Sequence, residues 1–170
     1  MAEERVPTLE GFFTEDGGAK VLGSKCVTCG IPYFPKAQAC HNPDCTESRM
    51  EDCTFAGKGT LWSYSVANFP PPPPHRFDEP FIPYVVGVVD MECGLRLIGQ
   101  MVDKPEDMKV GADVELVIDT LYHEDDKAFT TWKFKPKPEY LPLNQTSRQL
   151  TIQESESSIH NSPTTGLVPG

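Results

Sequence analysis

The sequence lacks two features that would place the protein at a membrane or outside the cell. It has no apolar run near the roughly 20 residues of a membrane-spanning helix. Its first twenty residues, MAEERVPTLEGFFTEDGGAK, have neither the basic start nor the apolar stretch of a secretory signal peptide. We therefore expect a cytoplasmic protein that does not act at a membrane.

Positive charge is also scarce. The chain carries 15 Lys and Arg against 25 Asp and Glu, for a formal net charge of -10. A negative field of this kind repels nucleic-acid phosphates and acidic lipid surfaces. The charge balance therefore disfavours nucleic acid as a partner and is otherwise typical of a chain kept in solution by its charge.

Large hydrophobic content is lacking as well. With 170 residues and 38% hydrophobic content, the chain can bury one moderate core or two small ones. Six cysteines would suffice for three disulfides in a secreted protein. In a reducing compartment, however, metal ligands and free thiols are more common than bridges.

The chain divides by composition into four zones. Residues 1–24 contain a helical candidate in which Thr8 caps a turn that carries Leu9, Phe12 and Phe13 at helix-like spacing. A helix this short must dock on something. It either packs on its own domain or helps to grip a partner.

The second and third zones predict a metal module and a β-barrel. Residues 25–54 hold four cysteines among Gly, Pro and Asn, with too few apolar residues to fold by burial alone. Residues 55–139 contain runs of strand length separated by turn residues, at 59–66, 84–89, 95–101, 113–118 and 129–134. Residues 92–94 predict a tight hairpin, and residues 109–111 predict the turn into the fourth strand. Five such strands after a cysteine-rich module favour a mainly β protein, a rubredoxin-like zinc ribbon followed by an OB-fold barrel.

Two further segments carry little regular structure. Pro70 to Pro74 predict an extended, stiff loop, because proline has no backbone N–H to donate. Such a loop either docks in an aromatic groove or lies against its own domain or an obligate partner. Residues 140–170 are rich in Ser, Thr, Gln and Pro without a period that would bury a face, so we expect a disordered tail.

The cysteine spacing is the strongest chemical signal. Cys26 and Cys29 have two residues between them, and Cys40 and Cys45 follow after ten more, separated by four. Two such pairs can direct four sulfurs at one tetrahedral ion. Gly30 follows the first pair, where a left-handed turn is often needed. The spacing predicts a structural zinc site, whose closed shell leaves no position for a catalytic water.

Alternatives to this ligand set remain. His41 can replace a cysteine, because the second pair is wider than the tightest zinc knuckles. Iron also binds four thiolates, although no electron-transfer partner is indicated. A metal-free or disulfide-bonded arrangement is the third possibility.

Outside the cluster, no catalytic constellation is predicted. Cys53 and Cys93 show none of the basic surroundings that a nucleophilic thiol requires. The isolated His75, His123 and His160 are typical of surface groups. The aromatic residues of the barrel strands are flanked by neutral or acidic positions, and core packing explains most of them.

The order of these modules resembles a known family, the zinc-ribbon-plus-OB proteins first catalogued as a domain of unknown function and found with acyl-CoA enzymes. The resemblance runs from about Leu9 to Pro138. It is carried by Cys26-x-x-Cys29-Gly30, Phe34-Pro35-Lys36, Cys40 to Cys45, Gly59-Thr60-Leu61-Trp62-Ser63-Tyr64, Pro83 to Val89, Gly94 to Gly99, Val110-Gly111 and Trp132-Lys133-Phe134. The Cys40 to Cys45 spacing departs from the family's usual Cys-Pro-x-Cys.

The resemblance implies an accessory role. Members of the family pair with thiolase-fold enzymes in hetero-oligomers without supplying the nucleophile. Within the family, the chain resembles small subunits of benzoylsuccinyl-CoA thiolases, which implies a CoA thioester substrate, benzoyl-CoA and succinyl-CoA as products, and a place in anaerobic toluene degradation. Catalytic residues are then expected on the partner. The alternatives are a stand-alone OB module that binds acyl-CoA or single-stranded nucleic acid, and an independent hydrolase.

Overall fold

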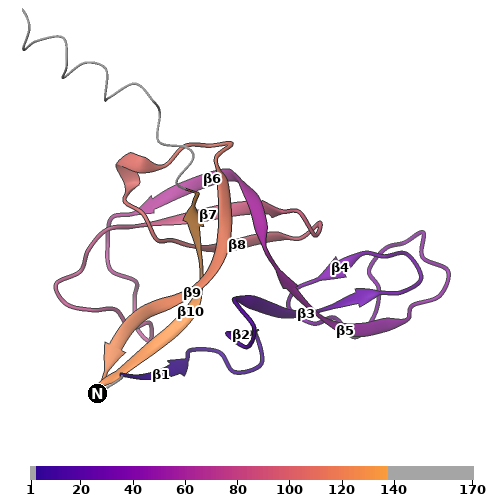
Figure 1. Ribbon diagram of the computed structural model, residues 1–170, viewed down its shortest axis with the longest axis horizontal. Helices are drawn as coiled ribbons and strands as arrows, with labels where there is room; N and C mark the ends of the chain where they lie inside the picture. The colour runs from indigo at the N-terminus through magenta and orange to yellow at the C-terminus, as the bar shows by residue number, and fades with distance from the viewer. Residues whose placement is uncertain (1–2, 138–170) are drawn as a thin grey trace, which may run out of the picture. The chain divides into compact units, whose positions relative to one another are not determined.

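The computed structural model describes residues 3–137, which form two β-sheets (Figure 1). A six-stranded sheet has the order β1-β10-β8-β7-β6-β9, and a four-stranded sheet contains β2, β3, β4 and β5. Their bounds are β1 Glu4–Pro7, β2 Phe13–Thr14, β3 Lys20–Cys26, β4 Pro32–Tyr33, β5 Met50–Ala56, β6 Lys58–Ala67, β7 Tyr84–Met91, β8 Arg96–Met101, β9 Asp113–Glu124 and β10 Lys127–Pro136. None of the described residues belongs to a helix long and apolar enough to cross a membrane.

The larger sheet closes into a five-stranded barrel. Strand β9 pairs with β6 on one side and with β10 on the other, while β10 also pairs in parallel with β8. The chain of pairings β6-β7-β8-β10-β9 therefore returns to β6, so these five strands close into a barrel. All five predicted strands are present, with β9 and β10 longer than expected. The OB-like barrel predicted from the sequence is confirmed.

Alternation along the strands builds the barrel core. In β7, positions 85, 87, 89 and 91 are buried while the positions between them are partly exposed. Side chains on successive strand residues point to opposite faces, so this period directs Val85 and Val89 inward. They share the core with Leu61, Val114 and Phe134, all at most 1% exposed.

The predicted turns lie where the sequence places them. Gly94 adopts a positive φ of 90° between β7 and β8, and its N–H donates to the carbonyl of Met91. Gly111 adopts a φ of 86° just before β9. The β9–β10 hairpin turns at Asp125 and Asp126, both with positive φ, as expected for a tight two-residue hairpin loop.

The prediction of an N-terminal helix is wrong. Within residues 3–137 the only helical element is the 3₁₀ turn Pro105–Asp107. Residues 4–7 instead form β1, which pairs in parallel with residues 127–130 of β10. The backbone N–H and the hydroxyl of Thr8 both donate to the carbonyl of Thr130, so the group expected to cap a helix extends this pairing.

The two aromatic residues of this segment enter the core. Phe13 opens β2, is 8% exposed and meets the ring of Trp132 edge-to-face. The Phe12 ring packs on Phe34, and the Phe12 carbonyl accepts from the N–H of Leu22. Sheet pairing and burial of these rings outweigh the weak helical spacing of a short segment.

The smaller sheet is held at one end by this same core. Strands β3 and β5 pair over seven positions, from Lys20 opposite Ala56 to Cys26 opposite Met50. At one end, Val21 and Phe55 face each other and are buried with the barrel residues. The other end of the sheet, at Cys26, carries the cysteine cluster. The expected disordered tail, residues 140–170, lies outside the described residues.

Candidate metal centre

Four cysteines converge at the end of the smaller sheet. The sulfurs of Cys26, Cys29, Cys40 and Cys45 all lie within 4.8 Å of one another. Cys26 Sγ is 3.7 Å from Cys45 Sγ, and Cys29 Sγ is 3.4 Å from Cys40 Sγ. All are free thiols rather than disulfides. The spacing of the sequence motif is thus matched by a compact sulfur cluster in space.

This geometry fits a tetrahedral ion. A zinc ion with four Zn–S bonds of about 2.3 Å separates its sulfurs by about 3.8 Å. The Cys29–Cys40 and Cys26–Cys45 Sγ–Sγ distances, 3.4 and 3.7 Å, lie close to that value. Four thiolates are also the donor set that zinc accepts in structural sites. The four close cysteines can therefore bind a metal, and zinc is consistent with them.

The first pair is positioned by the end of β3 and the turn after it. Cys26 is the last residue of β3, and its N–H donates to the carbonyl of Ile31 across the loop. Gly30 closes the turn by donating its N–H to the Cys26 carbonyl at 2.7 Å. Its φ of 79° is the left-handed conformation expected at this position.

Hydrogen bonds from nearby residues hold the second, wider cysteine pair in place. The side-chain oxygen of Asn42 accepts from the N–H of Asp44, and the Asn42 carbonyl accepts from the N–H of Cys45. The N–H of Cys40 donates to the hydroxyl of Ser48 at 2.7 Å. The Asx turn at Asn42 therefore accommodates the extra residues between Cys40 and Cys45, which the family's usual Cys-Pro-x-Cys spacing does not have.

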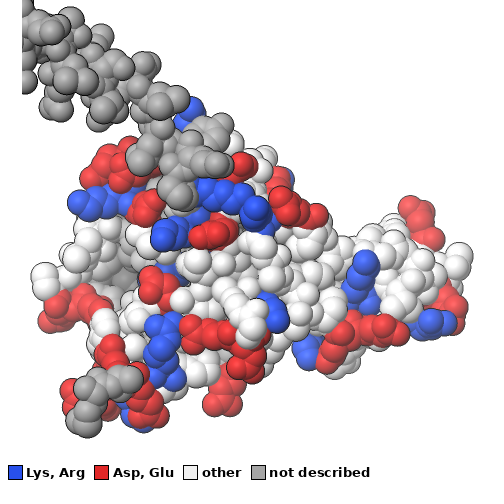
Figure 2. All heavy atoms as spheres, viewed as in Figure 1, with Lys and Arg blue, Asp and Glu red and all other residues white. Residues whose placement is uncertain are grey.

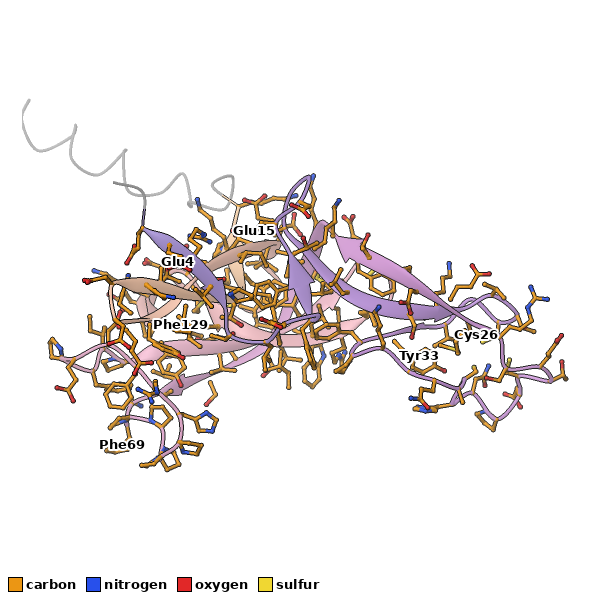
Figure 3. The ribbon with its side chains drawn as sticks, turned by 90° about the horizontal axis from the view of Figure 1, so that it is seen from below. Glu4, Glu15, Cys26, Tyr33, Phe69 and Phe129 are labelled. Carbon is orange, nitrogen blue, oxygen red and sulfur yellow. The ribbon has the colours of Figure 1, made fainter. Side chains whose placement is uncertain are left out.

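Tyr33 is a neighbour of the cluster that sequence reasoning missed. Its hydroxyl lies 3.3 Å from Cys40 Sγ and accepts the N–H of His41. Its ring also meets the His41 ring edge-to-face at 5.3 Å between centroids. His41 is not part of the sulfur cluster, so the geometry favours four cysteines over substitution by this histidine. Figure 3 shows Tyr33 and Cys26 at the same end of the smaller sheet.

The thiols of Cys26, Cys40 and Cys45 differ in acidity. Backbone N–H donation, chiefly from Cys29, lowers the pKa of the Cys26 thiol to about 6. The Tyr33 hydroxyl lowers the pKa of Cys40, and the same contact raises the pKa of Tyr33. Burial raises the pKa of Cys45 to about 12. Since metal ligands are thiolates, loading at neutral pH must displace a proton from Cys45.

The remaining candidate groups do not assemble a catalytic site among the described residues. Cys53 and Cys93 are half-buried beside the core, and burial raises the pKa of the Cys53 thiol, which makes it a poorer nucleophile. His123 has carboxylates at both ring nitrogens: Asp78 Oδ2 lies 2.7 Å from Nδ1, and Glu3 lies 3.6 Å from Nε2. Among residues 3–137, His123 therefore faces carboxylates and no nucleophile.

The His123–Asp78 contact holds a second feature in place, the loop of residues 68–83 between β6 and β7, which we term the proline loop. Asp78 accepts both the backbone N–H and the ring N–H of His123, and Arg76 pairs with Glu124. In OB folds, the corresponding loop and the hairpin between the last two strands flank the ligand-binding face. Here the Asp78–His123 and Arg76–Glu124 ion pairs connect the proline loop to the end of β9.

The protonation states of His123 and Asp78 should control how stably the proline loop is held against the end of β9. Hydrogen bonding to Asp78 raises the pKa of His123. Burial of Asp78 raises the pKa of its carboxyl, but the hydrogen bonds from His123 outweigh burial and hold it below its usual value. A raised histidine pKa adds stability below about pH 6.5 that is lost as pH rises through the folded pKa, whereas the lowered Asp78 pKa adds stability that is lost only in acid.

We expect loop amides of residues 75–82 to exchange faster, after correction for intrinsic rates, once pH rises above the His123 pKa. Hydrogen exchange with an NMR titration of His123 measures both quantities. Asp78→Asn should return the His123 pKa towards about 6.5 and remove the pH dependence. Equal amide protection below and above the His123 pKa in the wild-type chain would contradict this prediction.

The combination of folds defines a class of protein: an OB-like barrel joined to a four-cysteine module. A family model described as the C-terminal OB-fold domain of ChsH2 matches residues 54–119. A DUF35 domain-containing scaffold protein of Methanocaldococcus jannaschii is 35% identical over 120 residues, covering 69% of this chain and 81% of the relative. The chain belongs to this family of DUF35 domain-containing scaffold proteins.

Two further relatives come from enzyme complexes. The benzoylsuccinyl-CoA thiolase subunit BbsA of Thauera aromatica is 30% identical over 129 residues, covering 71% of this chain and 79% of the relative. A solved structure described as the Ltp2-ChsH2(DUF35) aldolase aligns with a TM-score of 0.51 and 29% identity, covering 69% of this chain and 84% of that chain. The chain is thus similar to subunits of thiolase and aldolase complexes.

Proposed function

We propose that this chain is a non-catalytic accessory subunit of a cytoplasmic acyl-CoA thiolase complex. The observation that carries the proposal is its similarity, across both modules, to proteins described as a thiolase subunit and as part of an aldolase. The described residues support it, because they bring together a closed cysteine cluster and a barrel without assembling a nucleophile and base. The catalytic residues then belong to a thiolase-fold partner.

The metal module supports the subunit rather than the reaction. We assign the zinc module to residues 25–54 and the barrel to residues 55–139. Cys26, Cys29, Cys40 and Cys45 would hold a structural zinc ion with no position left for substrate. Its contribution is to fix the loops at the end of the smaller sheet.

The similarity to BbsA supports a narrower substrate proposal. The complex would cleave benzoylsuccinyl-CoA with CoA to benzoyl-CoA and succinyl-CoA in anaerobic toluene degradation. The bonds balance: a carbon–carbon bond of the substrate and the S–H bond of CoA break, while the C–S bond of the new thioester and a C–H bond on the succinyl carbon form. This chain would position the partner and its substrate without bonding to either acyl group.

Co-expression with the thiolase-fold protein encoded nearest to this chain in its source genome tests the proposal. The two proteins should elute from gel filtration as one complex. Separate elution, with full thiolase activity in the partner alone, would rule the accessory role out. Tight binding of acyl-CoA or an oligonucleotide by this chain alone would instead support a stand-alone OB module.

A further inference from the structure

The proline loop presents the most exposed large apolar side chains in the described part of the chain. Phe69 is 82% exposed and Ile82 is 75% exposed, near the two ends of the loop, with Pro70 to Pro74 between them in the sequence. Figure 3 shows Phe69 at the outer end of the loop. Exposed apolar groups gathered on one segment are typical of a protein–protein contact.

The loop is anchored through residues 76–84, which we term its base. Phe77 meets Phe81 edge-to-face, and Phe81 meets Tyr84 at the start of β7 in the same way. The Asp78–His123 and Arg76–Glu124 pairs fix the same base to the end of β9. A loop that is already ordered loses less conformational entropy when it binds, so these contacts preorganise the loop for docking.

Charge around the loop indicates what kind of surface it meets. Although the chain has 25 acidic residues, none lies between Asp52 and Asp78. Figure 2 shows white spheres on the outer part of the loop, at the left edge of the view, with red spheres beside them. Within residues 3–137, Glu79, Asp125 and Asp126 make no ion pair. The loop is therefore an apolar surface with an acidic border.

A second copy of this chain is a poor match for such a surface. A symmetric contact through the loop would bring the acidic border of one copy towards that of the other, because an isologous interface uses the same patch twice. The net charge of -10 adds repulsion at longer range. A partner with an apolar groove and a basic rim complements the loop in both shape and charge.

We propose that the proline loop is the docking element for the catalytic subunit, inserting Phe69 and Ile82 into an apolar, aromatic-lined groove whose rim is basic. The inference rests on the proposed accessory function and names the surface that carries it out. Proline-rich segments dock in aromatic-lined grooves. Here the run ends in a turn, because the N–H of His75 donates to the carbonyl of Pro72. The acidic residues at the β9–β10 turn then contact the basic rim and speed association.

The test uses the full chain and the same thiolase-fold protein, with Kd measured by biolayer interferometry. In the loop variant, Phe69→Ser with Ile82→Ser, Kd should rise at least about 30-fold, as for truncation of central interface residues. The matched control is Trp62→Ser with Ile98→Ser, an aromatic and an aliphatic residue exposed by 54% and 62% on strands β6 and β8. Its Kd should change less than about 3-fold.

A charge variant tests the border separately. Asp125→Asn with Asp126→Asn keeps residue types that tolerate the positive φ of this turn. It should slow association several-fold at low salt and weaken the salt dependence, with little change in dissociation. An unchanged salt dependence would overturn the basic-rim part of the proposal.

The outcomes separate the two proposals. If the wild-type chain does not bind the thiolase-fold protein, the accessory function fails. If it binds and the loop variant binds within about 3-fold of it, the docking inference fails while the accessory function stands. Equal weakening by the Trp62 and Ile98 control also overturns the inference, as does a wild-type dimer that the loop variant converts to monomer. Unchanged zinc content and circular dichroism establish that the variants are folded.

Discussion

Replacing Cys40 by Ser, or stripping the metal with a chelator, should unfold the segment of residues 26–50 while the barrel stays folded. This segment has few buried apolar residues: Cys26 is its only buried hydrophobic residue. Metal binding in such modules supplies folding free energy directly, with apparent values of about 10–16 kcal/mol in zinc-finger peptides. No other interaction described in the segment approaches that magnitude.

The expected boundary of this unfolding lies within the smaller sheet. Val21 and Phe55, opposite each other on β3 and β5, belong to the same core as the barrel. That end of the sheet should therefore persist without metal. Hydrogen exchange should show lost protection at the amides of Cys26, Gly30 and Cys45 and retained protection at Val85 and Val89.

A cysteine on β5, the strand that pairs with β3, provides a matched control. Cys53→Ser makes the same chemical change at a cysteine outside the cluster, and it should keep about one zinc per chain and full protection in residues 26–50. Zinc content by elemental analysis accompanies the exchange measurement. Stoichiometric zinc together with wild-type protection in Cys40→Ser would contradict the assignment of this ligand.

Phe134→Ala should cost about 3–5 kcal/mol of unfolding free energy, the usual range for removing a large buried aromatic ring. Phe134 is completely buried at the centre of the barrel, and its ring lies where a Cβ on Gly99 would approach within 2.9 Å. The space that Gly99 leaves is thus filled by this ring. A natural domain has only about 5–15 kcal/mol of stability, so the loss is a large share of the total.

Phe69→Ala is the matched control, because it removes the same atoms from a side chain that is 82% exposed. Its unfolding free energy should change by less than about 0.5 kcal/mol. Urea denaturation followed by circular dichroism measures both variants. Comparable losses would mean that Phe69 is needed for folding, and the proline loop would then owe its exposed side chains to stability rather than to docking.

The barrel was predictable because its signal is local. Each of the five strands shows apolar alternation or an apolar run over at least six residues, and Gly94 and Gly111 mark turns whose positive φ favours glycine. The cysteine cluster was predictable for the same reason, since metal ligands come in short spaced pairs. These features require no knowledge of distant parts of the chain.

Most of the features that sequence reasoning missed depend on partners far away in the chain. Strand β1 exists because residues 127–130 offer it a free edge, more than 120 residues later. Nothing in a short window distinguishes that strand from the helix expected there. The Asp78–His123 contact was missed in the same way, because 45 positions separate the two residues. Tyr33 is a local miss, since Cys40 follows it by only seven positions, and only the folded loop shows that its hydroxyl reaches the cluster.

The most direct test of the accessory role is turnover of benzoylsuccinyl-CoA and CoA by three samples: this chain alone, the thiolase-fold protein alone, and the complex of the two. We expect no turnover by this chain and full turnover by the complex. The thiolase-fold protein alone should be strongly impaired. Full turnover by that protein alone, or turnover by this chain alone, would contradict the accessory role.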